Sequence, residues 1–191
     1  MLIYKIAYWI NTVLQIVIRT PFGMGTRSRK KAEQRVSPTE NILLIFLTIT
    51  TGILPLIYSV TNWLAFADYA LPTWMGWMGI FIMACSLLIF WRAHYDLKTN
   101  WSPSLELYEG HTLITNGIYR YIRHPMYASL LLANIAQILL IQNWIAGPIS
   151  IVMFILFYTF RSRAEEKMML ERFGDQYREY KKATGGILPK L

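Results

Sequence analysis

Residues 117–127 read GIYRYIRHPMY, and they decide the fold because an apolar segment begins where they end. A second apolar segment follows and ends at Arg161, with Glu165 and Glu166 directly beyond it. Two successive membrane crossings return a chain to the face from which it started. Both charged clusters are therefore expected at one face. This pattern predicts a polar site at a lipid boundary, suited to a water-soluble cofactor and an oily substrate.

The composition favours a membrane protein. Of the 191 residues, 54% are hydrophobic and 16% are charged, whereas a soluble domain has about 45–50% apolar and about 25% charged residues. Seven Trp and twelve Tyr residues suit side chains that anchor helices at the membrane interface. The length suits one domain.

The net charge of +8 could indicate nucleic-acid binding, but the distribution of the charges argues against it. Eighteen of the nineteen basic residues lie in segments 19–35, 92–124 and 161–191, and the connectors around Asp68 and Asn143 have none. Such alternation is the positive-inside pattern of a protein with several spans. It predicts an N-terminus outside, a C-terminus in the cytosol and no nucleic-acid partner.

The apolar segments predict five transmembrane helices, since a span needs about 20 predominantly apolar residues. The expected spans are Leu2–Ile18, Asn41–Val60, Thr73–Trp91, Met126–Gln142 and Trp144–Phe160. A cleaved signal peptide is the alternative for the first segment. No A-x-A cleavage site follows it, so a retained helix is favoured. Gly52 and Pro55 are expected to kink the second span.

The polar intervals complete the expected fold. Segment 20–38 is predicted to be a basic cytosolic loop, and segment 93–124 a structured cytosolic loop. A short strand or turn is expected near Leu105–Leu107 and near His111–Ile114. The chain beyond Phe160 should continue as a cytosolic helix that Gly174 interrupts or caps.

The predicted class is an all-α integral membrane protein that forms a single membrane domain over residues 1–191. Residues 1–92 would hold the first three spans and the basic loop. Residues 93–191 would hold the cofactor-binding and catalytic region, with a helical hairpin at 125–160.

The dipeptide His124-Pro125 predicts a helix start. Proline favours an extended conformation for the residue before it and fits the first position of a helix. The free N–H groups of that first turn, together with Arg123, would form an anion site. Anchoring of Arg123 and His124 at lipid head groups is the alternative.

Arg161 and Glu165 are four residues apart and share one face of a helix. They could be a simple ion pair, which stabilises a helix by about 0.2–0.5 kcal/mol. Their position at the end of a span, opposite a second polar cluster, makes them candidates for a site. Glu166 is expected to face elsewhere, toward solvent.

Two further patterns bear on ligands. The aromatic rings of Tyr119, Tyr121 and Tyr127 could attract a sulfonium-like cation, or could be ordinary interface anchors. The three histidines lack the spacing of zinc ligands, so no metal site is predicted.

Three blocks in order resemble the isoprenylcysteine carboxyl methyltransferase family, and most closely its short five-span prokaryotic members. The blocks are Gly117-x-Tyr119-x-x-x-Arg123-His124-Pro125-x-Tyr127, then Arg161-x-x-x-Glu165-Glu166, then Phe173-Gly174-x-x-Tyr177-x-x-Tyr180. The resemblance runs from about Trp101 to the C-terminus. The first hundred residues match only in topology and in the basic loop.

The resemblance implies S-adenosylmethionine-dependent methyl transfer to the carboxylate of a lipid-modified, isoprenylcysteine-like substrate at the cytosolic membrane face. Arg161 and Glu165 would be catalytic, with Arg161 assigned to the substrate. The prenyl chain would enter sideways between spans, and no obligate protein partner is expected. The implied cofactor-binding residues are His111, Thr112, Leu113, Ile114, Gly117, Tyr119, Arg123, His124, Pro125, Met126, Tyr127 and Glu165.

This chemistry suits the residues present. A carboxylate is ionised at neutral pH, with a reference pKa near about 4, and needs no general base to attack a methyl sulfonium. Alignment of the reacting atoms is the main task. We expect Arg161 to orient the acceptor carboxylate and Glu165 to offset the cofactor's positive charge. His124 and the helix start would hold the cofactor's carboxylate end.

Three alternatives stay open. Methylation of a phospholipid or other small lipid amine would need a base, and none is obvious beyond Glu165 or His124. Membrane sterol reductases end in similar blocks and use a nicotinamide cofactor, but they are typically longer. A small membrane scaffold without enzymatic activity is the last alternative.

Overall fold

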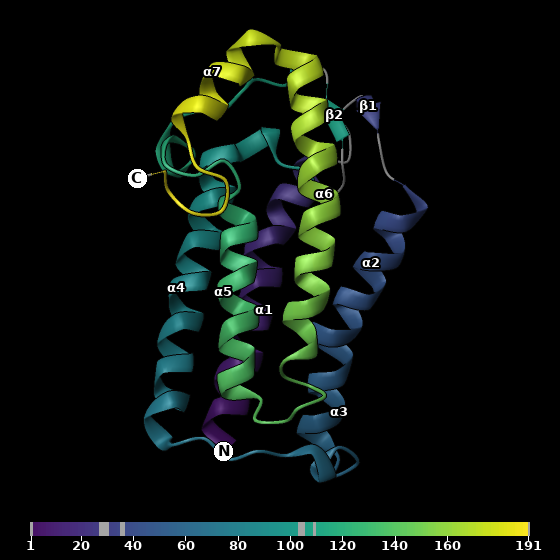
Figure 1. The fold of residues 1–191 in the computed structure, drawn as a ribbon, viewed down its shortest axis with the longest axis vertical. Helices are drawn as coiled ribbons and strands as arrows, with labels where there is room; N and C mark the ends of the chain where they lie inside the picture. Colours follow the sequence, from purple (N-terminus) through teal and green to yellow (C-terminus); the bar gives the residue numbers. More distant parts are fainter. Residues whose placement is uncertain (1, 27–30, 35–36, 103–105, 109, 191) are drawn as a thin grey trace.

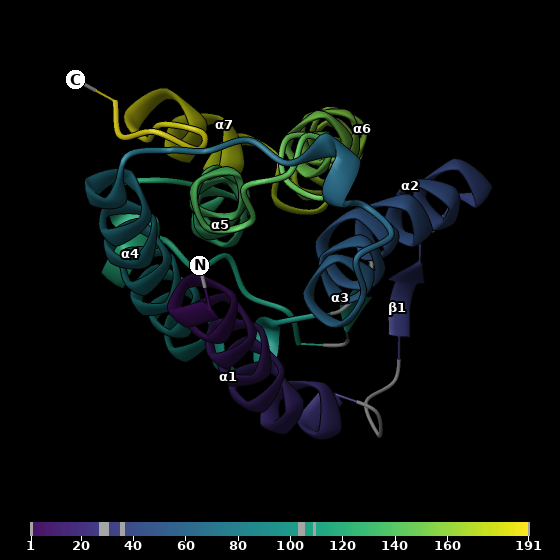
Figure 2. The same cartoon turned by 90° about the horizontal axis from the view of Figure 1, so that it is seen from below.

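The computed structural model describes residues 2–26, 31–34, 37–102, 106–108 and 110–190. Within these residues the chain forms a bundle of long helices with a shorter helix across one end (Figure 1). The helices are α1 Leu2–Thr26, α2 Pro38–Thr48, α3 Leu54–Val60, α4 Thr73–Leu97, α5 Pro125–Leu140, α6 Ile149–Phe173 and α7 Asp175–Ala183. Seen along the bundle, α5 lies between α4 and α6 and packs against both (Figure 2).

The second predicted span is present as two helices, α2 and α3, joined by a π-helical turn over Ile49–Ile53. The expected irregularity near Gly52 and Pro55 therefore exists as this turn. Pro55 lacks an N–H group and cannot complete the regular ladder, so a wider turn is a physically reasonable result. At the other end, the hydroxyl of Ser37 caps α2 by accepting from the backbone N–H of Glu40 at 3.1 Å.

Three predicted boundaries were wrong. Helix α4 continues past Trp91 to Leu97, into the predicted loop 93–124. Helix α1 continues past Ile18 to Thr26, with Pro21 inside it, so the predicted loop begins later than residue 20. Helix α6 begins at Ile149 rather than at Trp144. The side chain of Asn143 explains the late start of α6, because its Oδ1 accepts from Ile145 N and Ala146 N at 3.1 Å each and holds a turn there.

The polar end of the molecule carries one short antiparallel pair of strands, β1 Lys31–Gln34 and β2 Glu106–Tyr108. Strand β2 overlaps the strand or turn expected at Leu105–Leu107, although Leu105 lies outside the described residues. Residues His111–Ile114 have no regular structure. The all-α expectation is thus confirmed for the bundle, and this pair of strands is an addition to it.

The C-terminal part follows the prediction closely. Helix α6 runs beyond Phe160 to Phe173, and Gly174 then takes a φ of +52°, which separates α6 from α7. A glycine suits this left-handed position because it has no Cβ.

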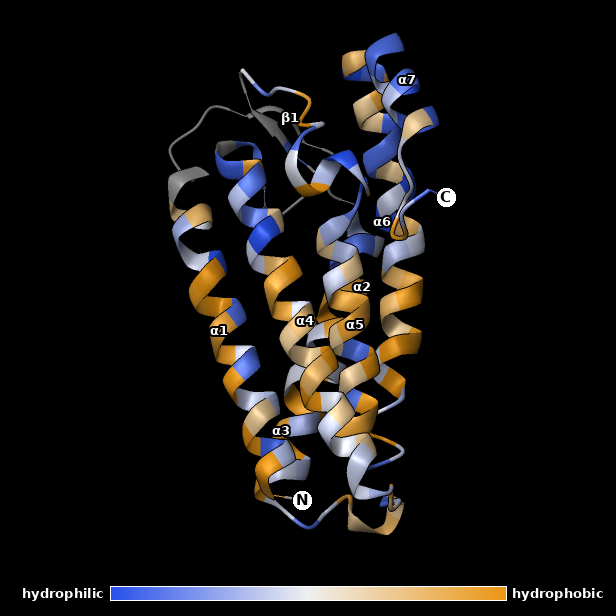
Figure 3. Cartoon of the chain, turned by 90° about the vertical axis from the view of Figure 1, so that its left-hand side faces the viewer, coloured by the Kyte–Doolittle hydropathy of each residue, from blue (hydrophilic) through white to orange (hydrophobic). Residues whose placement is uncertain are grey.

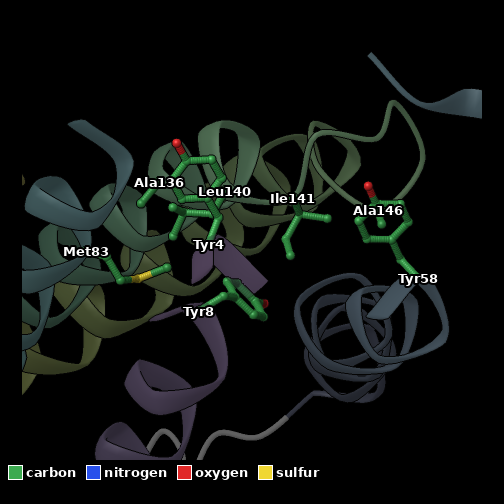
Figure 4. Packing of buried hydrophobic residues seen from close by; sticks show 8 residues of the cluster. All are labelled: Tyr4, Tyr8, Tyr58, Met83, Ala136, Leu140, Ile141 and Ala146. Carbon is green, nitrogen blue, oxygen red and sulfur yellow. The ribbon is translucent and has the colours of Figure 1, made fainter. Parts of the chain in front are cut away.

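The bundle is closed at the end remote from α7 by a cluster of buried side chains (Figure 4). Tyr4 and Tyr8 of α1 meet Met83 of α4 and Leu140 of α5 there. Helices α1 and α4 approach closely at Gly76, where a Cβ atom would lie 2.3 Å from Cζ of Tyr4.

Large apolar side chains point outward over much of the bundle. Examples are Ile6 and Val13 on α1, Phe81 and Leu88 on α4, and Ile155 on α6. Figure 3 shows apolar residues along much of the helices, with hydrophilic residues gathered around α7 and the adjoining end of α6. Such a surface suits contact with lipid.

By length and composition alone, two stretches could cross a membrane, Pro38–Val60 and Thr73–Leu97, and Pro125–Leu140 is a shorter apolar helix. The count of five spans stays a prediction.

Candidate active site

An open cavity of about 880 Å³ lies at the polar end of the bundle. Its walls come from the segment between α4 and α5, the first turn of α5, the polar part of α6, and α7. Nearly all residues that the sequence singled out line it. These are His111, Thr112, Leu113, Ile114, Tyr119, Arg123, His124, Pro125, Met126, Tyr127, Arg161 and Glu165.

Tyr121, which is 62% exposed, and Glu166 do not line the cavity, and neither does Gly117. Its φ is +60°, and a Cβ atom there would lie 2.1 Å from Oδ2 of Asp96 on α4. The same oxygen accepts a hydrogen bond from the backbone N–H of Ile118 at 2.7 Å. Gly117 therefore lets the loop close against the end of α4.

Tyr127 joins the two charged residues of α6 that the sequence singled out. Arg161 Nε donates to the Tyr127 hydroxyl at 2.9 Å, and that hydroxyl donates to Glu165 Oε2 at 2.8 Å. Arg161 is buried, whereas the Glu165 side chain is 33% exposed. The expected proximity of Arg161 and Glu165 is thus present, but a tyrosine from α5 connects them.

Arg161 also forms an ion pair with Glu40, at the start of α2. Sequence reasoning missed Glu40. It is only 5% exposed, so its charge sits in a poorly solvated place and needs this partner. The available signal was an acidic residue at the mouth of an apolar span, where ionisable groups tend to be paired. The partner, 121 positions away, could not be named from sequence.

Glu166, which follows Glu165 on α6, was predicted to face solvent, and this prediction is wrong. Its Oε1 accepts from Arg123 Nε and Nη2 at 3.1 and 2.9 Å and lies 3.3 Å from His124 Nε2. Its Oε2 lies 2.5 Å from Lys181 Nζ. The prediction was wrong because α7 and the segment after it fold back over this face of α6.

These contacts change the acidity of Glu166. The hydrogen bond with His124, followed by those with Lys181 and Arg123, holds the pKa of Glu166 well below its usual range. Each of these partners favours the ionised form of the carboxyl group.

The C-terminal segment fixes the turn that precedes α5. The backbone N–H groups of Arg123 and His124 donate to the carbonyls of Gly185 and Gly186 at 2.8 and 3.1 Å. The Arg123 side chain also donates to the Thr184 carbonyl. His124 has φ −122° and ψ 58°, so its ψ falls short of the extended value expected from sequence.

Tyr180 of α7 holds the same turn from another side, since its hydroxyl donates to the Tyr119 carbonyl at 2.6 Å. Burial raises the pKa of Tyr180 to about 12, so this hydroxyl keeps its proton at neutral pH. The Arg123 side chain is thus committed to Glu166 and to backbone carbonyls. The anion site at the start of α5 stays a prediction.

A second cavity of about 1000 Å³ extends from the first into the bundle. Side chains of α1, α2, α4, α5 and α6 line it, among them Ile16, Leu44, Phe90, Leu130 and Phe157. The two cavities share the wall residues Trp101, Ser102, Met126, Tyr127 and Arg161. Arg161 and Tyr127 therefore stand between an open polar cavity and one inside the apolar bundle.

Several buried polar atoms on these walls have no hydrogen-bond partner among the described residues. Examples are Nδ1 of His124 on the open cavity, Nε2 of His94 on the inner cavity and Nε1 of Trp101 on both. Buried polar groups are rarely left unpaired, so each is a candidate contact for a ligand.

Fold and site together define a helical-bundle protein with a charged cavity at the junction between its apolar bundle and its polar end. Residues 77–171, which hold most of the site, match the model of the isoprenylcysteine carboxyl methyltransferase family. This region of the chain is therefore similar to that family.

Named relatives agree. Protein-S-isoprenylcysteine O-methyltransferase from Dictyostelium discoideum is 29% identical over 61% of this chain and 50% of its own length. The Homo sapiens protein of that name is 28% identical over 61% of this chain and 42% of its own length. The Saccharomyces cerevisiae protein is 37% identical over 41% of this chain and 33% of its own length. The chain thus spans half or less of these relatives.

A solved structure shares the fold. The eukaryotic intramembrane Ras methyltransferase ICMT superimposes with a TM-score of 0.55 and 23% identity, over 81% of this chain and 53% of that one.

Proposed function

We propose that this chain transfers the methyl group of S-adenosylmethionine to the carboxylate of a lipid-modified, isoprenylcysteine-like acceptor. The observation that carries the proposal is the shared wall of the two cavities. Arg161 and Tyr127 line both the open polar cavity and the cavity inside the bundle. A water-soluble ligand in the first and a lipid-tailed ligand in the second would meet at these side chains.

The open cavity fits a cationic cofactor. The partly exposed carboxylate of Glu165 and the rings of Tyr119, Tyr127 and Tyr177 line it, and both kinds of group attract a sulfonium. His124 Nδ1 is buried on its wall without a partner among the described residues, and a ligand N–H group would satisfy it. When bound, S-adenosylmethionine supplies an electrophilic methyl group on sulfur.

We assign the remaining cofactor contacts to the segment before α5. Asn100 Nδ2 donates to Thr112 Oγ1 at 3.2 Å, which holds residues 111–114 against the end of α4. His111, Thr112, Leu113 and Ile114 then form one wall of the cavity, and Pro125 and Met126 form another. Gly117 would contribute indirectly, because it lets this loop close against the end of α4.

Arg161 would orient the acceptor carboxylate, with Trp101 Nε1–H as a second donor. An acceptor carboxylate is already ionised at neutral pH, so no protein group has to remove a proton. The contribution of the chain is then alignment of the reacting oxygen and exclusion of water, and alignment alone can lower a barrier by about 7–11 kcal/mol. Glu40 shares the Arg161 guanidinium, and the acceptor would compete with it.

We place the site at the cytosolic membrane face and the N-terminus outside, within one membrane domain. Basic residues in α7 and in the polar end of α6, such as Arg163, Lys181 and Lys182, support this orientation, since cytosolic ends carry an excess of Lys and Arg.

Methylation of a lipid amine is the second candidate, and one observation favours it. His94 Nδ1 lies 2.8 Å from the Phe90 carbonyl and must carry a proton there, which leaves a lone pair on Nε2. Nε2 is buried without a partner among the described residues, and His94 lines the inner cavity. Such a nitrogen could accept the proton that an ammonium acceptor must lose.

The test is transfer of labelled methyl from S-adenosylmethionine to an S-farnesyl or S-geranylgeranyl cysteine analogue, in detergent or lipid. We expect ester product from the wild type and none from Arg161→Ala. Arg163→Ala is the matched control, because Arg163 is exposed two residues further along α6. Product on a lipid amine that disappears in His94→Phe would favour the second candidate. Binding of NADPH in place of S-adenosylmethionine would refute both.

A further inference from the structure

A third cavity of about 490 Å³ lies deeper in the bundle and adjoins the second one. The two share the wall residues Thr12, Gln15, Leu47, Thr51 and Leu130. We call this third space the deep chamber. Its polar lining residues are Tyr8, Asn11, Thr12, Gln15, Thr51, Asn134 and Gln137.

The polar lining of the deep chamber is unexpected for a pocket that would hold a hydrocarbon. Tyr8, Asn11 and Gln15 follow helical spacing on the inner face of α1, while Val13 and Val17 of the same helix are exposed. Polar side chains inside a membrane bundle are unfavourable unless they find partners.

Some of these side chains are satisfied by the protein. Tyr8 donates to the Thr51 carbonyl, and its hydroxyl lies 3.1 Å from Gln137 Oε1. Gln137 Nε2 donates to the carbonyls of Thr50 and Ala146 at 2.9 and 2.7 Å. Both hydrogens of that amide are therefore used in holding the helices together.

Asn134 and Asn11 differ from these side chains because each has a side-chain oxygen without a hydrogen-bond partner among the described residues. Asn134 Nδ2 donates to the Leu130 carbonyl at 2.7 Å, and because a carbonyl only accepts, this bond fixes which way the amide points. Its Oδ1 is then an acceptor, buried and without a partner among the described residues, as is Oδ1 of Asn11. The two residues are 3% and 6% exposed. An unpaired buried acceptor calls for an O–H or N–H donor.

The distance from the proposed reaction centre follows from the helix. Asn134 comes seven residues after Tyr127 on α5, which is about 10 Å at a rise of about 1.5 Å per residue. A lipid chain whose carboxylate lies at Arg161 would cross the second cavity and reach the deep chamber after this length.

We infer that the acceptor's lipid chain carries a hydroxyl or a similar hydrogen-bond donor about 10 Å from its carboxylate, and that Asn134 and Asn11 accept from it. This inference rests on the proposed function. A plain hydrocarbon chain of the same length would enter the deep chamber but would leave both oxygens unpaired. The preferred acceptor is then an isoprenylcysteine-like acid whose lipid chain carries an oxygen.

The experiment compares two S-alkyl cysteine acceptors of equal length, one with a hydroxyl at that distance and one without. A third, short acceptor ends before the deep chamber. We expect kcat/KM to be about tenfold higher for the hydroxylated chain, as one hydrogen bond to a buried acceptor allows. Asn134→Leu should abolish this preference and leave turnover of the short acceptor unchanged.

Asn11→Leu is the second variant, should Asn134→Leu fail to fold, and it should also reduce the preference. Asn62→Leu is the control, because Asn62 is exposed in the connector before α4. Equal use of the two long acceptors by the wild type would overturn the inference, as would a preference that survives both variants. Turnover of the short acceptor would still support the proposed function in those cases.

If no acceptor is methylated, the proposed function fails, and binding of the same two labelled long chains decides the inference by itself. Tighter binding of the hydroxylated chain, lost in Asn134→Leu, would support it. Equal binding would overturn it.

Discussion

Replacement of Glu40 by Gln tests whether Glu40 competes with an acceptor carboxylate for binding to Arg161. Glu40 and Arg161 form an ion pair with side chains only 6% and 9% exposed. An acceptor carboxylate on the same guanidinium would place two negative charges about 5 Å apart, which costs about 3 kcal/mol at an effective dielectric of about 20. That energy corresponds to about 100-fold in affinity.

The repulsion changes along the reaction. The acceptor loses its negative charge as the ester forms, so Glu40 opposes the bound acceptor more than it opposes the transition state. Glu40→Gln should therefore lower KM for the acceptor by about tenfold to 100-fold and lower kcat as well, which is the signature of relieved ground-state strain. The ratio kcat/KM should change less than either constant.

The assay is methyl transfer at saturating S-adenosylmethionine over a range of acceptor concentrations. Glu171→Gln is the matched control. Glu171 is an exposed carboxylate on α6, and the same change there removes one negative charge at the surface. A raised KM in Glu40→Gln would refute the reasoning, because it would mean that Glu40 positions Arg161 for the acceptor and does not compete with it. Thermal unfolding should also show a loss of stability, because the variant leaves a buried guanidinium without its ion-pair partner.

Three further predictions follow from the described contacts. Tyr127→Phe removes the hydroxyl that joins α5 to two side chains of α6; kcat/KM should fall about tenfold or more, while circular dichroism stays unchanged. Because the folded-state pKa of Glu166 is depressed, its stabilising effect is present above its unfolded pKa of about 4.3. It is lost as the pH falls from there toward the folded value, so wild-type Tm should drop in acid, and Glu166→Gln should show a flatter dependence. Gly117→Ala should lower Tm more than Gly110→Ala does, because both glycines have positive φ but only the Cβ at Gly117 meets Asp96.

The convergence of the two charged clusters could be predicted because it depends on one local feature. A hairpin of two apolar helices returns the chain to its starting face, so Tyr127 and Arg161 had to lie at the same end. Arg161 and Glu165 could be placed on one face by helical spacing. The end of α6 could be placed as well, since Gly174 supplies a left-handed residue.

Features that depend on distant packing could not be predicted. The pairing of Glu40 with Arg161 joins helices far apart in sequence. The orientation of Glu166 depends on how α7 folds back, and the carbonyls of Gly185 and Gly186 hold the turn at Arg123 and His124 that faces it. The late start of α6 depends on Asn143, whose Nδ2 reaches the Leu64 carbonyl at 2.6 Å. None of these contacts has a local pattern.

The adjacent carboxylates of α6, Glu165 and Glu166, have different partners because different segments pack against them. Glu166 is matched by Arg123 and Lys181 and lies beside His124, so its charge is used in holding α7 and the C-terminal segment in place. Within the described part of the chain, no Arg or Lys forms an ion pair with Glu165, whose nearest basic atom is His124 Nδ1 at 3.9 Å.

Arg161, one turn before Glu165 on α6, is itself paired with Glu40. Among the described residues, two carboxylates line the open cavity, the partly exposed Glu165 and the buried Glu106, and both favour a negative cavity. A cavity with that sign, inside a protein whose net charge is +8, selects a ligand with a positive centre over the anions that the rest of the surface attracts. The proposed sulfonium cofactor meets this requirement, and a nicotinamide dinucleotide with its phosphates does not.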